Sequence, residues 1–308
     1  MKVYLGAPRG FCAGVVRAID IVELALEKFG APVYVKHQIV HNPYVVNSLA
    51  LKGAITVEDV ANIPQNSIVV FSAHGSPPED YQIAQQRDLR VVDATCPLVT
   101  KVHNEAKKYS NDGRRILLVG HRGHQEVKGT MGQTDMHLVD DRETGNLPIW
   151  PQNTPITVLT QTTLSVDDTK STIEDVKHHF EDVVVRNDLC YATTNRQESV
   201  KKLCEVAGIV LVIGAENSSN CNRLREMAEA HGVSAYLING PDELNMSWLC
   251  GIENVGITSG ASTPEELVLS VIDKLAPNEI IRVEGVQEDI TFVLPDEFRD
   301  DVSNVPAS

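Results

Sequence analysis

Each third of the chain contains a short apolar run that ends near a cysteine and is followed at once by apolar residues at helical spacing. The three cysteines are Cys12, Cys96 and Cys190. A strand that leads directly into a helix is typical of α/β folds with parallel sheets, whose ligands bind at the carboxyl ends of the strands. The repeated pattern therefore predicts three similar α/β modules whose cysteines meet at one point.

Strands and helices alternate along most of the sequence, which places the chain in the α/β class with mostly parallel sheets. We expect one module over residues 14–96, a second over 97–190, and a third over 191–280 together with 1–13. The remaining residues, 281–308, are expected to form a strand at 289–294 and then an acidic end that frays.

The composition limits the possible partners and the cellular location. A chain of 308 residues with a net charge of −15 is a poor match for nucleic acid or an anionic membrane. The sequence has no apolar run of the roughly 18–20 residues that a membrane span needs, and no secretory signal is visible. We therefore expect a cytoplasmic protein, in which six cysteines are thiols or metal ligands rather than disulfides.

The cysteines at the strand ends are the candidate metal ligands. A thiol such as that of Cys12, near backbone N–H groups at the start of a helix, is expected to favour the thiolate. Cys204 and Cys250 lie in apolar surroundings and are expected in the core, and Cys221 is expected to be part of a helix. Three thiolates suit zinc with a histidine, or an iron–sulfur cluster. Their wide separation along the chain favours a buried cluster, and a four-iron cluster would keep one iron open for chemistry.

Histidines and one carboxylate fall in loops on the same expected face. His41, His74 and His124 each lie near glycine or proline at a turn, and Glu126 follows as a candidate proton donor. A single loop histidine most often only faces solvent, but three histidines on the ligand face favour a binding site. Residues 217–220 and 259–263 each precede a helix, where backbone N–H groups and hydroxyls suit phosphate, with ordinary helix capping as the alternative.

Longer strings of the sequence resemble one enzyme family, the 4-hydroxy-3-methylbut-2-enyl diphosphate reductases, which catalyse the last step of the non-mevalonate isoprenoid pathway. The resemblance extends from residue 1 to about residue 295. The strings are Arg9-Gly-Phe-Cys-Ala-Gly14, Val40-His-Asn42, Phe71-Ser-Ala-His-Gly75, Asp93-Ala-Thr-Cys-Pro-Leu-Val-Thr-Lys-Val-His103, Gly129-Thr-Met-Gly132, Thr160-Gln-Thr-Thr-Leu-Ser165, Cys190-Tyr-Ala-Thr-Thr-Asn-Arg-Gln197, Asn217-Ser-Ser-Asn220 and Gly260-Ala-Ser262.

The resemblance implies three α/β modules around one [4Fe-4S] cluster per chain, held by Cys12, Cys96 and Cys190. It implies that the substrate's allylic hydroxyl is removed with two electrons and two protons, giving isopentenyl and dimethylallyl diphosphates. Glu126 would supply the proton, with Thr162 and His124 in the relay. The residues implied in diphosphate binding are His41, His74, His124, Ser218, Ser219, Asn220 and Ser262.

The resemblance also implies an electron donor, a ferredoxin or a flavodoxin, and the chain is expected to be a monomer. Because such donors are usually acidic, we expect a local basic patch near the cluster, with Arg9, Arg17, Lys101 and Arg196 as candidate members. From residue types alone two alternatives stay open: a cluster-dependent hydro-lyase, and a metal- or phosphate-binding module without redox activity.

Overall fold

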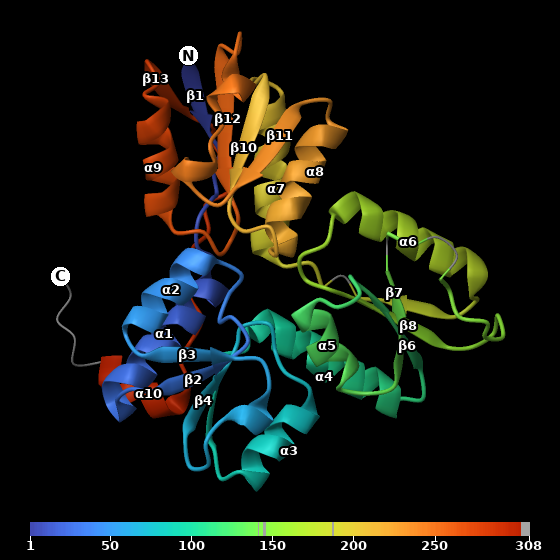
Figure 1. Ribbon diagram of the computed structural model, residues 1–308. Helices are drawn as coiled ribbons and strands as arrows, with labels where there is room; N and C mark the ends of the chain where they lie inside the picture. Colours follow the sequence, from blue (N-terminus) through green and yellow to red (C-terminus); the bar gives the residue numbers. More distant parts are fainter. Residues whose placement is uncertain (141, 144–145, 187, 303–308) are drawn as a thin grey trace.

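The computed structural model describes residues 1–140, 142–143, 146–186 and 188–302, which form three separate parallel β-sheets with helices around them (Figure 1). All ten strand pairings given for the three sheets are parallel. The prediction of three α/β modules with parallel sheets is therefore confirmed.

The first sheet has the strand order β3-β2-β4-β5 and the second has the order β7-β6-β8-β9. The strands and helices of the first sheet are α1 (Ala13–Phe29), β2 (Val33–Lys36), α2 (Pro43–Leu51), β3 (Ala54–Val57), β4 (Ile68–Phe71), α3 (Pro78–Gln86) and β5 (Arg90–Asp93). Those of the second are α4 (Pro97–Asn111), β6 (Arg115–Val119), α5 (Gln125–Met131), β7 (Met136–Val139), β8 (Ile156–Thr160), α6 (Val166–His179) and β9 (Val183–Val185).

The third sheet, in the order β11-β10-β12-β1-β13, combines the N-terminal strand with strands from the last third of the chain. Its elements are β1 (Lys2–Leu5), α7 (Tyr191–Cys204), β10 (Ile209–Ile213), α8 (Ser219–Ala230), β11 (Ser234–Ile238), β12 (Asn254–Ser259), α9 (Glu265–Leu275) and β13 (Glu279–Arg282). Short 3₁₀ helices occupy Val60–Asn62, Pro241–Glu243 and Met246–Leu249.

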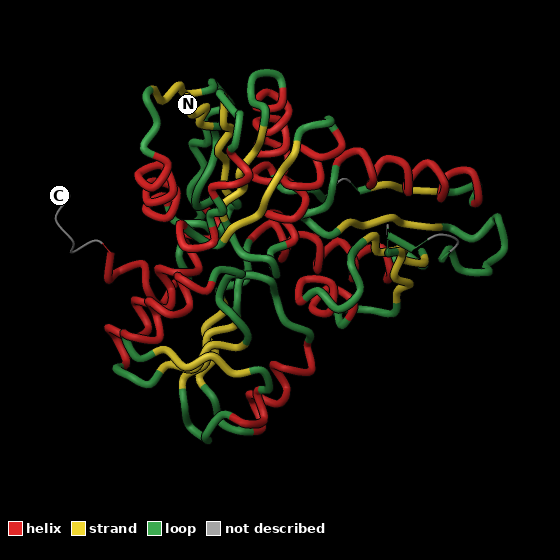
Figure 2. Tube along the Cα trace, turned by 45° about the horizontal axis from the view of Figure 1, so that its top comes forward, coloured by secondary structure: helices red, strands yellow, loops and turns green. Residues whose placement is uncertain are grey.

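The central strands are apolar runs without alternation. Every residue of β8 and of β10 is buried, as expected for a parallel sheet that is covered by helices on both faces. The three sheets lie around a common centre, and the loops at their strand ends converge there (Figures 1 and 2). No helix in the described ranges is long and apolar enough to cross a membrane.

The predicted strand at 289–294 is wrong. The edge beside β1 is already taken by β13, and residues 283–295 form an extended segment without regular secondary structure, which we call the strap. Beyond the strap, residues that we expected to fray form α10 (Asp296–Val302). The reason is burial, because Phe298 is fully buried against Phe29 in the core of the first sheet. The last expected fraying residues, 303–308, lie outside the described residues.

Candidate active site

The strand-end loops of the three sheets enclose one cavity. All twelve residues singled out as candidate site residues line it: Cys12, Cys96, Cys190, Glu126, His41, His74, His124, Thr162, Ser218, Ser219, Asn220 and Ser262. They come from loops that are far apart in the sequence, so the cavity exists only when the three sheets are assembled.

The three cysteines occupy equivalent positions. Each is the N-cap residue of a helix: Cys12 of α1, Cys96 of α4 and Cys190 of α7. Each backbone N–H donates to a carbonyl of another strand-end loop, namely that of Ala261 (3.1 Å), Ala73 (3.0 Å) and Thr162 (3.0 Å), respectively. The repeat seen in the sequence is therefore a repeat of backbone geometry, which fixes each cysteine at the cavity wall.

The thiols of the other two cysteines, Cys96 and Cys190, lie in surroundings that oppose the thiolate. Burial raises the pKa of the Cys96 thiol to about 11, with further contributions from the nearby Cys12. Burial also raises the pKa of Cys190 to about 12, although its sulfur accepts a hydrogen bond from the Thr193 backbone (3.3 Å). Desolvation outweighs the helix N-terminus here, and a metal group bound between the cysteines would favour the thiolate form of these sulfurs.

The space between the cysteines suits a group larger than one ion. A Cβ on Gly14 would lie 2.8 Å from the Cys96 sulfur and 3.8 Å from the Cys12 sulfur, so the two sulfurs share one small volume that only glycine leaves open. Among the described residues, no three histidine, cysteine or carboxylate side chains are arranged around a single metal ion. The donor set of three cysteines around a shared space therefore fits an iron–sulfur group better than zinc.

Glu126 is held deep in the cavity by Thr162, which follows strand β8 of the second sheet. The Glu126 side chain accepts hydrogen bonds from the Thr162 backbone N–H (2.6 Å) and the Thr162 hydroxyl (2.9 Å). Burial nevertheless raises the pKa of Glu126 to about 7, and the charge of Asp188 adds to the shift. A carboxyl with this pKa is present in both protonation states near neutral pH, which suits a proton donor.

Three histidines form a contiguous row. The rings of His41 and His74 are stacked with centroids 4.0 Å apart, and the His124 ring meets them edge-on at 5.3 and 6.1 Å. Burial lowers the pKa of His41 to about 4 and that of His124 to about 3, and it lowers the pKa of His74 well below 6.5. The row is neutral in the free protein at neutral pH, and it can gain protons when an anion binds beside it.

The lowered pKa values of the three histidines predict that the folded protein becomes less stable as the pH falls. We expect the free energy of unfolding to fall by about 1 kcal/mol per histidine between pH 7 and 5.5, because the unfolded chain takes up protons near pH 6.5 while the folded row does not. Stability thus rises with pH through this window. Urea unfolding of the anaerobic protein at the two pH values measures the effect. His74→Asn should weaken the pH dependence of the unfolding free energy, whereas His178→Asn, at an exposed position of α6, should leave it unchanged. An equal pH dependence in the two variants would contradict the explanation.

Hydroxyl and amide groups cover the side of the cavity next to the histidines. Ser218 caps α8 by accepting from the Cys221 N–H (3.4 Å), and Ser262 donates to the His41 carbonyl (3.0 Å). Asn220 accepts from the Ala261 N–H (3.1 Å), but its buried side-chain nitrogen has no partner among the residues that the structure describes. Part of this loop is ordinary helix capping, and the unpartnered Asn220 donor is the feature that capping leaves unexplained.

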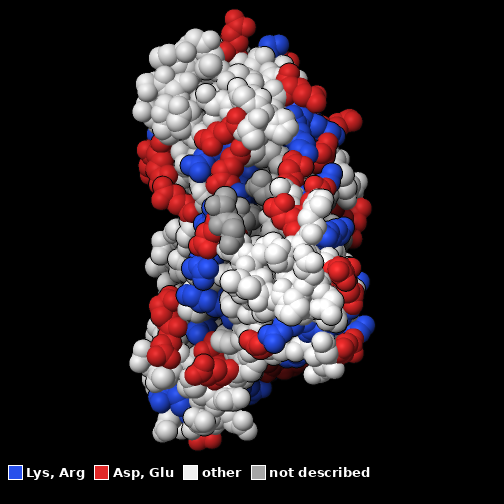
Figure 3. Space-filling view, turned by 90° about the vertical axis from the view of Figure 1, so that its right-hand side faces the viewer, with Lys and Arg blue, Asp and Glu red and all other residues white. Residues whose placement is uncertain are grey.

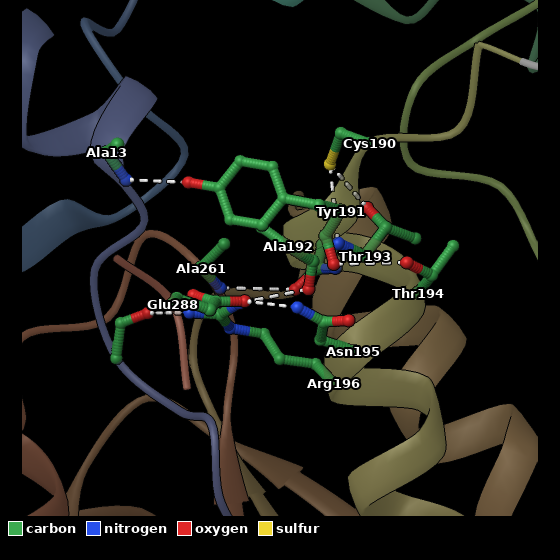
Figure 4. A network of polar contacts seen from close by, with 12 residues as sticks. Ala13, Cys190, Tyr191, Ala192, Thr193, Thr194, Asn195, Arg196, Ala261 and Glu288 are labelled. Carbon is green, nitrogen blue, oxygen red and sulfur yellow. Dashed lines mark hydrogen bonds and ion pairs between the residues drawn. The ribbon is translucent and has the colours of Figure 1, made fainter. Parts of the chain in front are cut away.

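Sequence reasoning missed several residues that complete the cavity. Tyr191 joins two of the cysteine segments, because its hydroxyl accepts from the Ala13 N–H (3.2 Å) beside Cys12 (Figure 4). The Thr193 hydroxyl lies 3.0 Å from the Cys190 sulfur. Phe292, in the strap, lines the cavity from the far end of the chain. Tyr191 and Thr193 lie within the family-like string that begins at Cys190, whereas nothing in the sequence marked Phe292.

Arg196 is not part of a basic patch. It is 0% exposed and donates to the Gly10 carbonyl (2.7 Å), and it pairs with Glu288 at 3.0 Å (Figure 4). Arg9 pairs with Glu265 and adds no free positive charge. Arg17 and Lys101 do lie near Cys96, where both line a groove beside Thr95 and Pro97.

The other cysteines are only partly as expected. Cys221 is buried in α8, whereas Cys204 is half-buried and Cys250 is exposed after a short 3₁₀ helix. The prediction of a core position is therefore wrong for Cys250. None of these three cysteines lines the cavity.

Comparison with known proteins gives one consistent result. The family model described as LytB protein matches residues 3–276. A protein of Bradyrhizobium diazoefficiens named 4-hydroxy-3-methylbut-2-enyl diphosphate reductase 2 is 52% identical over 305 residues, covering 97% of this chain and 99% of its own. A protein of Zymomonas mobilis with the same enzyme name is 49% identical, covering 97% of this chain and 90% of its own.

Solved structures agree with the sequence matches. The structure of the E-1-hydroxy-2-methyl-but-2-enyl-4-diphosphate reductase from Plasmodium falciparum superposes with a TM-score of 0.93 at 35% identity, covering 98% of each chain. A second structure, described as (E)-4-hydroxy-3-methyl-but-2-enyl diphosphate reductase, the terminal enzyme of the non-mevalonate pathway, has a TM-score of 0.63 at 31% identity. It covers 89% of this chain and 99% of its own.

Proposed function

The chain belongs to the LytB protein family, and from this premise we propose that it is a 4-hydroxy-3-methylbut-2-enyl diphosphate reductase of the non-mevalonate isoprenoid pathway. The reaction breaks the allylic C–O bond of the substrate. Two electrons and two protons are consumed, one water leaves, and isopentenyl or dimethylallyl diphosphate remains. The observation that carries the proposal is the match to a named reductase along 97% of the chain.

Cys12, Cys96 and Cys190 would hold one [4Fe-4S] cluster per chain, which supplies electrons and an open Lewis-acidic iron when it is bound. Three cysteines around one cavity support this assignment, because a four-iron cluster with three protein ligands keeps its fourth iron free. We further propose that the protein is a monomer and that a ferredoxin or a flavodoxin supplies the electrons.

The remaining cavity residues bind and orient the substrate. The diphosphate would lie against the histidine row and the hydroxyl groups of Ser218, Ser219 and Ser262, with the unpartnered Asn220 amide as a further donor. Hydrogen bonds to a charged group contribute about 1.5–3 kcal/mol each, so a few local donors can outweigh the repulsion of an acidic chain. This position directs the allylic end of the substrate toward the cysteines and Glu126.

Glu126 would give its proton to the substrate hydroxyl, so that the oxygen leaves as water rather than as hydroxide. The two hydrogen bonds from Thr162 hold the carboxyl in one orientation, and the closed, buried setting keeps its pKa near 7. The His124 ring accepts the Glu126 backbone N–H (3.2 Å), which ties the phosphate side of the cavity to the proton donor.

The test begins with an anaerobic absorption spectrum and with iron and sulfide counts on the purified protein. The expected result is a broad visible band, iron and sulfide in the amounts of one cluster, and formation of both isoprenoid diphosphates when dithionite is supplied. A colourless zinc protein after anaerobic reconstitution would overturn the proposal. Turnover that needs no reductant would favour a hydro-lyase instead.

The partition of the six cysteines makes a separate prediction. We expect Cys12→Ser to lose most of its iron and sulfide, because one of three ligands is removed. Cys204→Ser should keep both, because Cys204 lies outside the cavity. Iron and sulfide analysis of the two variants, prepared side by side, measures this. Equal losses would show that the strand-end cysteines have no special role.

A further inference from the structure

A groove lies on the outer side of the cavity wall, between α1 and the strap. We call it the outer groove; it is lined by Val16 and Arg17 of α1, by Tyr191, and by strap residues including Ile290 and Phe292. A second groove runs along α4 and shares the lining residue Arg17 with the first, so the two adjoin at this side chain. Both lie directly outside the segments that carry the cysteines.

Two aromatic side chains separate the outer groove from the cavity. Tyr191 and Phe292 line both spaces, so they form the wall between them. Tyr191 follows Cys190, and its hydroxyl bonds to the N–H of Ala13, the neighbour of Cys12. Among the cavity-lining residues, these two are the ones that also face the outer groove. An electron that arrives in this groove is therefore one side chain away from the cysteine segments.

The surface around the outer groove is apolar and exposed. Val16 is 42% exposed, Ile290 43% and Val293 68%. The strap that carries two of them is fixed in place, since Arg17 bonds both the Val293 carbonyl (2.8 Å) and the Thr95 carbonyl (3.1 Å). Exposed apolar side chains on a preformed surface commonly mark a contact site for another protein.

The charge around the two grooves differs from that of the whole chain. The chain has 42 acidic and 27 basic residues, and acidic side chains are spread over the face shown in Figure 3. The grooves are lined instead by four basic residues, Arg17, Arg299, Lys101 and Lys108, and by three acidic ones, Asp20, Glu105 and Glu288. Ion pairs neutralise lining residues of both signs. Glu288 pairs with Arg196 and Glu105 with Arg186, while Arg299 pairs with Asp296 and Lys101 with Asp188, so the slight excess of basic groups is unchanged. This part of the surface repels an acidic protein less than the remainder does.

We propose that the outer groove is the docking surface for a small acidic protein that carries one electron at a time. The proposal rests on the proposed function, which needs two electrons per turnover and hence two encounters with such a carrier. In each encounter the carrier is oxidised by one electron and leaves. An apolar centre with a charged rim and a small contact area is typical of transient electron-transfer complexes.

The experiment adds a charge to the apolar centre. In Val16→Glu/Ile290→Glu, we expect kcat/KM with a reduced acidic ferredoxin to fall about tenfold or more, because two carboxylates replace apolar contacts and repel the partner. Turnover driven by dithionite should be unchanged, because neither residue lines the cavity. The matched control is Leu269→Glu on α9, which is 50% exposed and lines neither groove. Flavodoxin is measured in parallel to distinguish the two kinds of carrier.

Binding provides a readout that is independent of turnover. A photo-crosslinking residue at position 290 should capture the oxidised carrier, and the same residue at position 269 should not. Normal carrier-driven rates in the double variant, or an equal loss in Leu269→Glu, would overturn the docking site. If the double variant failed to hold its metal, Lys108→Glu at the rim would carry the same comparison. Failure of the wild-type protein to turn over with dithionite would contradict the proposed function instead.

Discussion

Replacement of Glu126 by glutamine is expected to lower turnover by about 10²–10⁴-fold while substrate binding is retained, the usual scale for loss of a general acid. Glutamine keeps the shape of the side chain and can still bond to Thr162, but it has no acidic proton to give. The substrate hydroxyl must then leave without protonation. Dithionite-driven turnover and substrate affinity, measured on the same preparation, separate these two effects.

The pH dependence gives the same prediction a second test. Since burial raises the pKa of Glu126 to about 7, the proton-donating form is lost as the pH rises through this value. Wild-type turnover should therefore decline above about pH 7, and the decline should be absent in Glu126→Gln. Glu181→Gln, an exposed glutamate of the same module, serves as the control and should retain both rate and pH profile. A Glu126→Gln variant with a near-normal rate would remove the carboxyl from the proton role.

The position of the cavity could be predicted from the sequence because it depends on a local pattern, a strand that leads directly into a helix. Strands that end in cysteine or histidine place those side chains at the carboxyl edge of a sheet, and parallel sheets bring such edges together. The apolar runs of β8 and β10 could be recognised without any knowledge of their neighbours. The assignments of individual residues to cluster, diphosphate or proton remain predictions, because proximity in the cavity does not assign a role.

The errors share a physical cause, which is that they depend on distant partners. Residues 289–294 have a strand-like composition, but β13 had already taken the edge position next to β1. The acidic end was expected to fray, and only the assembled structure shows that Phe298 is buried against Phe29. Arg196 was expected in a basic surface patch. Its burial could not be foreseen, because its partner Glu288 lies 92 residues away along the chain. Burial and pairing across the chain cannot be inferred from spacing along one segment.

The buried ion pair between Arg196 and Glu288 is expected to contribute strongly to stability. We expect Arg196→Leu to lower the free energy of unfolding by about 3–5 kcal/mol, the range observed when one partner of a buried ion pair is removed. The variant leaves the Glu288 carboxylate, whose side chain is 13% exposed, without its charge partner. It also leaves the Gly10 carbonyl without the donor that Arg196 supplies at 2.7 Å. Urea unfolding of the anaerobic protein measures the loss.

Two further variants decide whether the charge is responsible. Arg196→Leu/Glu288→Leu should recover part of the stability, because no unpaired charge then remains buried, and the coupling follows from the double-mutant cycle. Arg299→Leu, which breaks the exposed pair with Asp296 (2.7 Å), should cost less than about 1 kcal/mol. Since Arg196 joins α7, the segment before Cys12 and the strap, we also expect Arg196→Leu to hold less iron than Arg299→Leu. If Arg196→Leu and Arg299→Leu were equally stable, the buried pair would not be what fastens the strap to the cysteine segments.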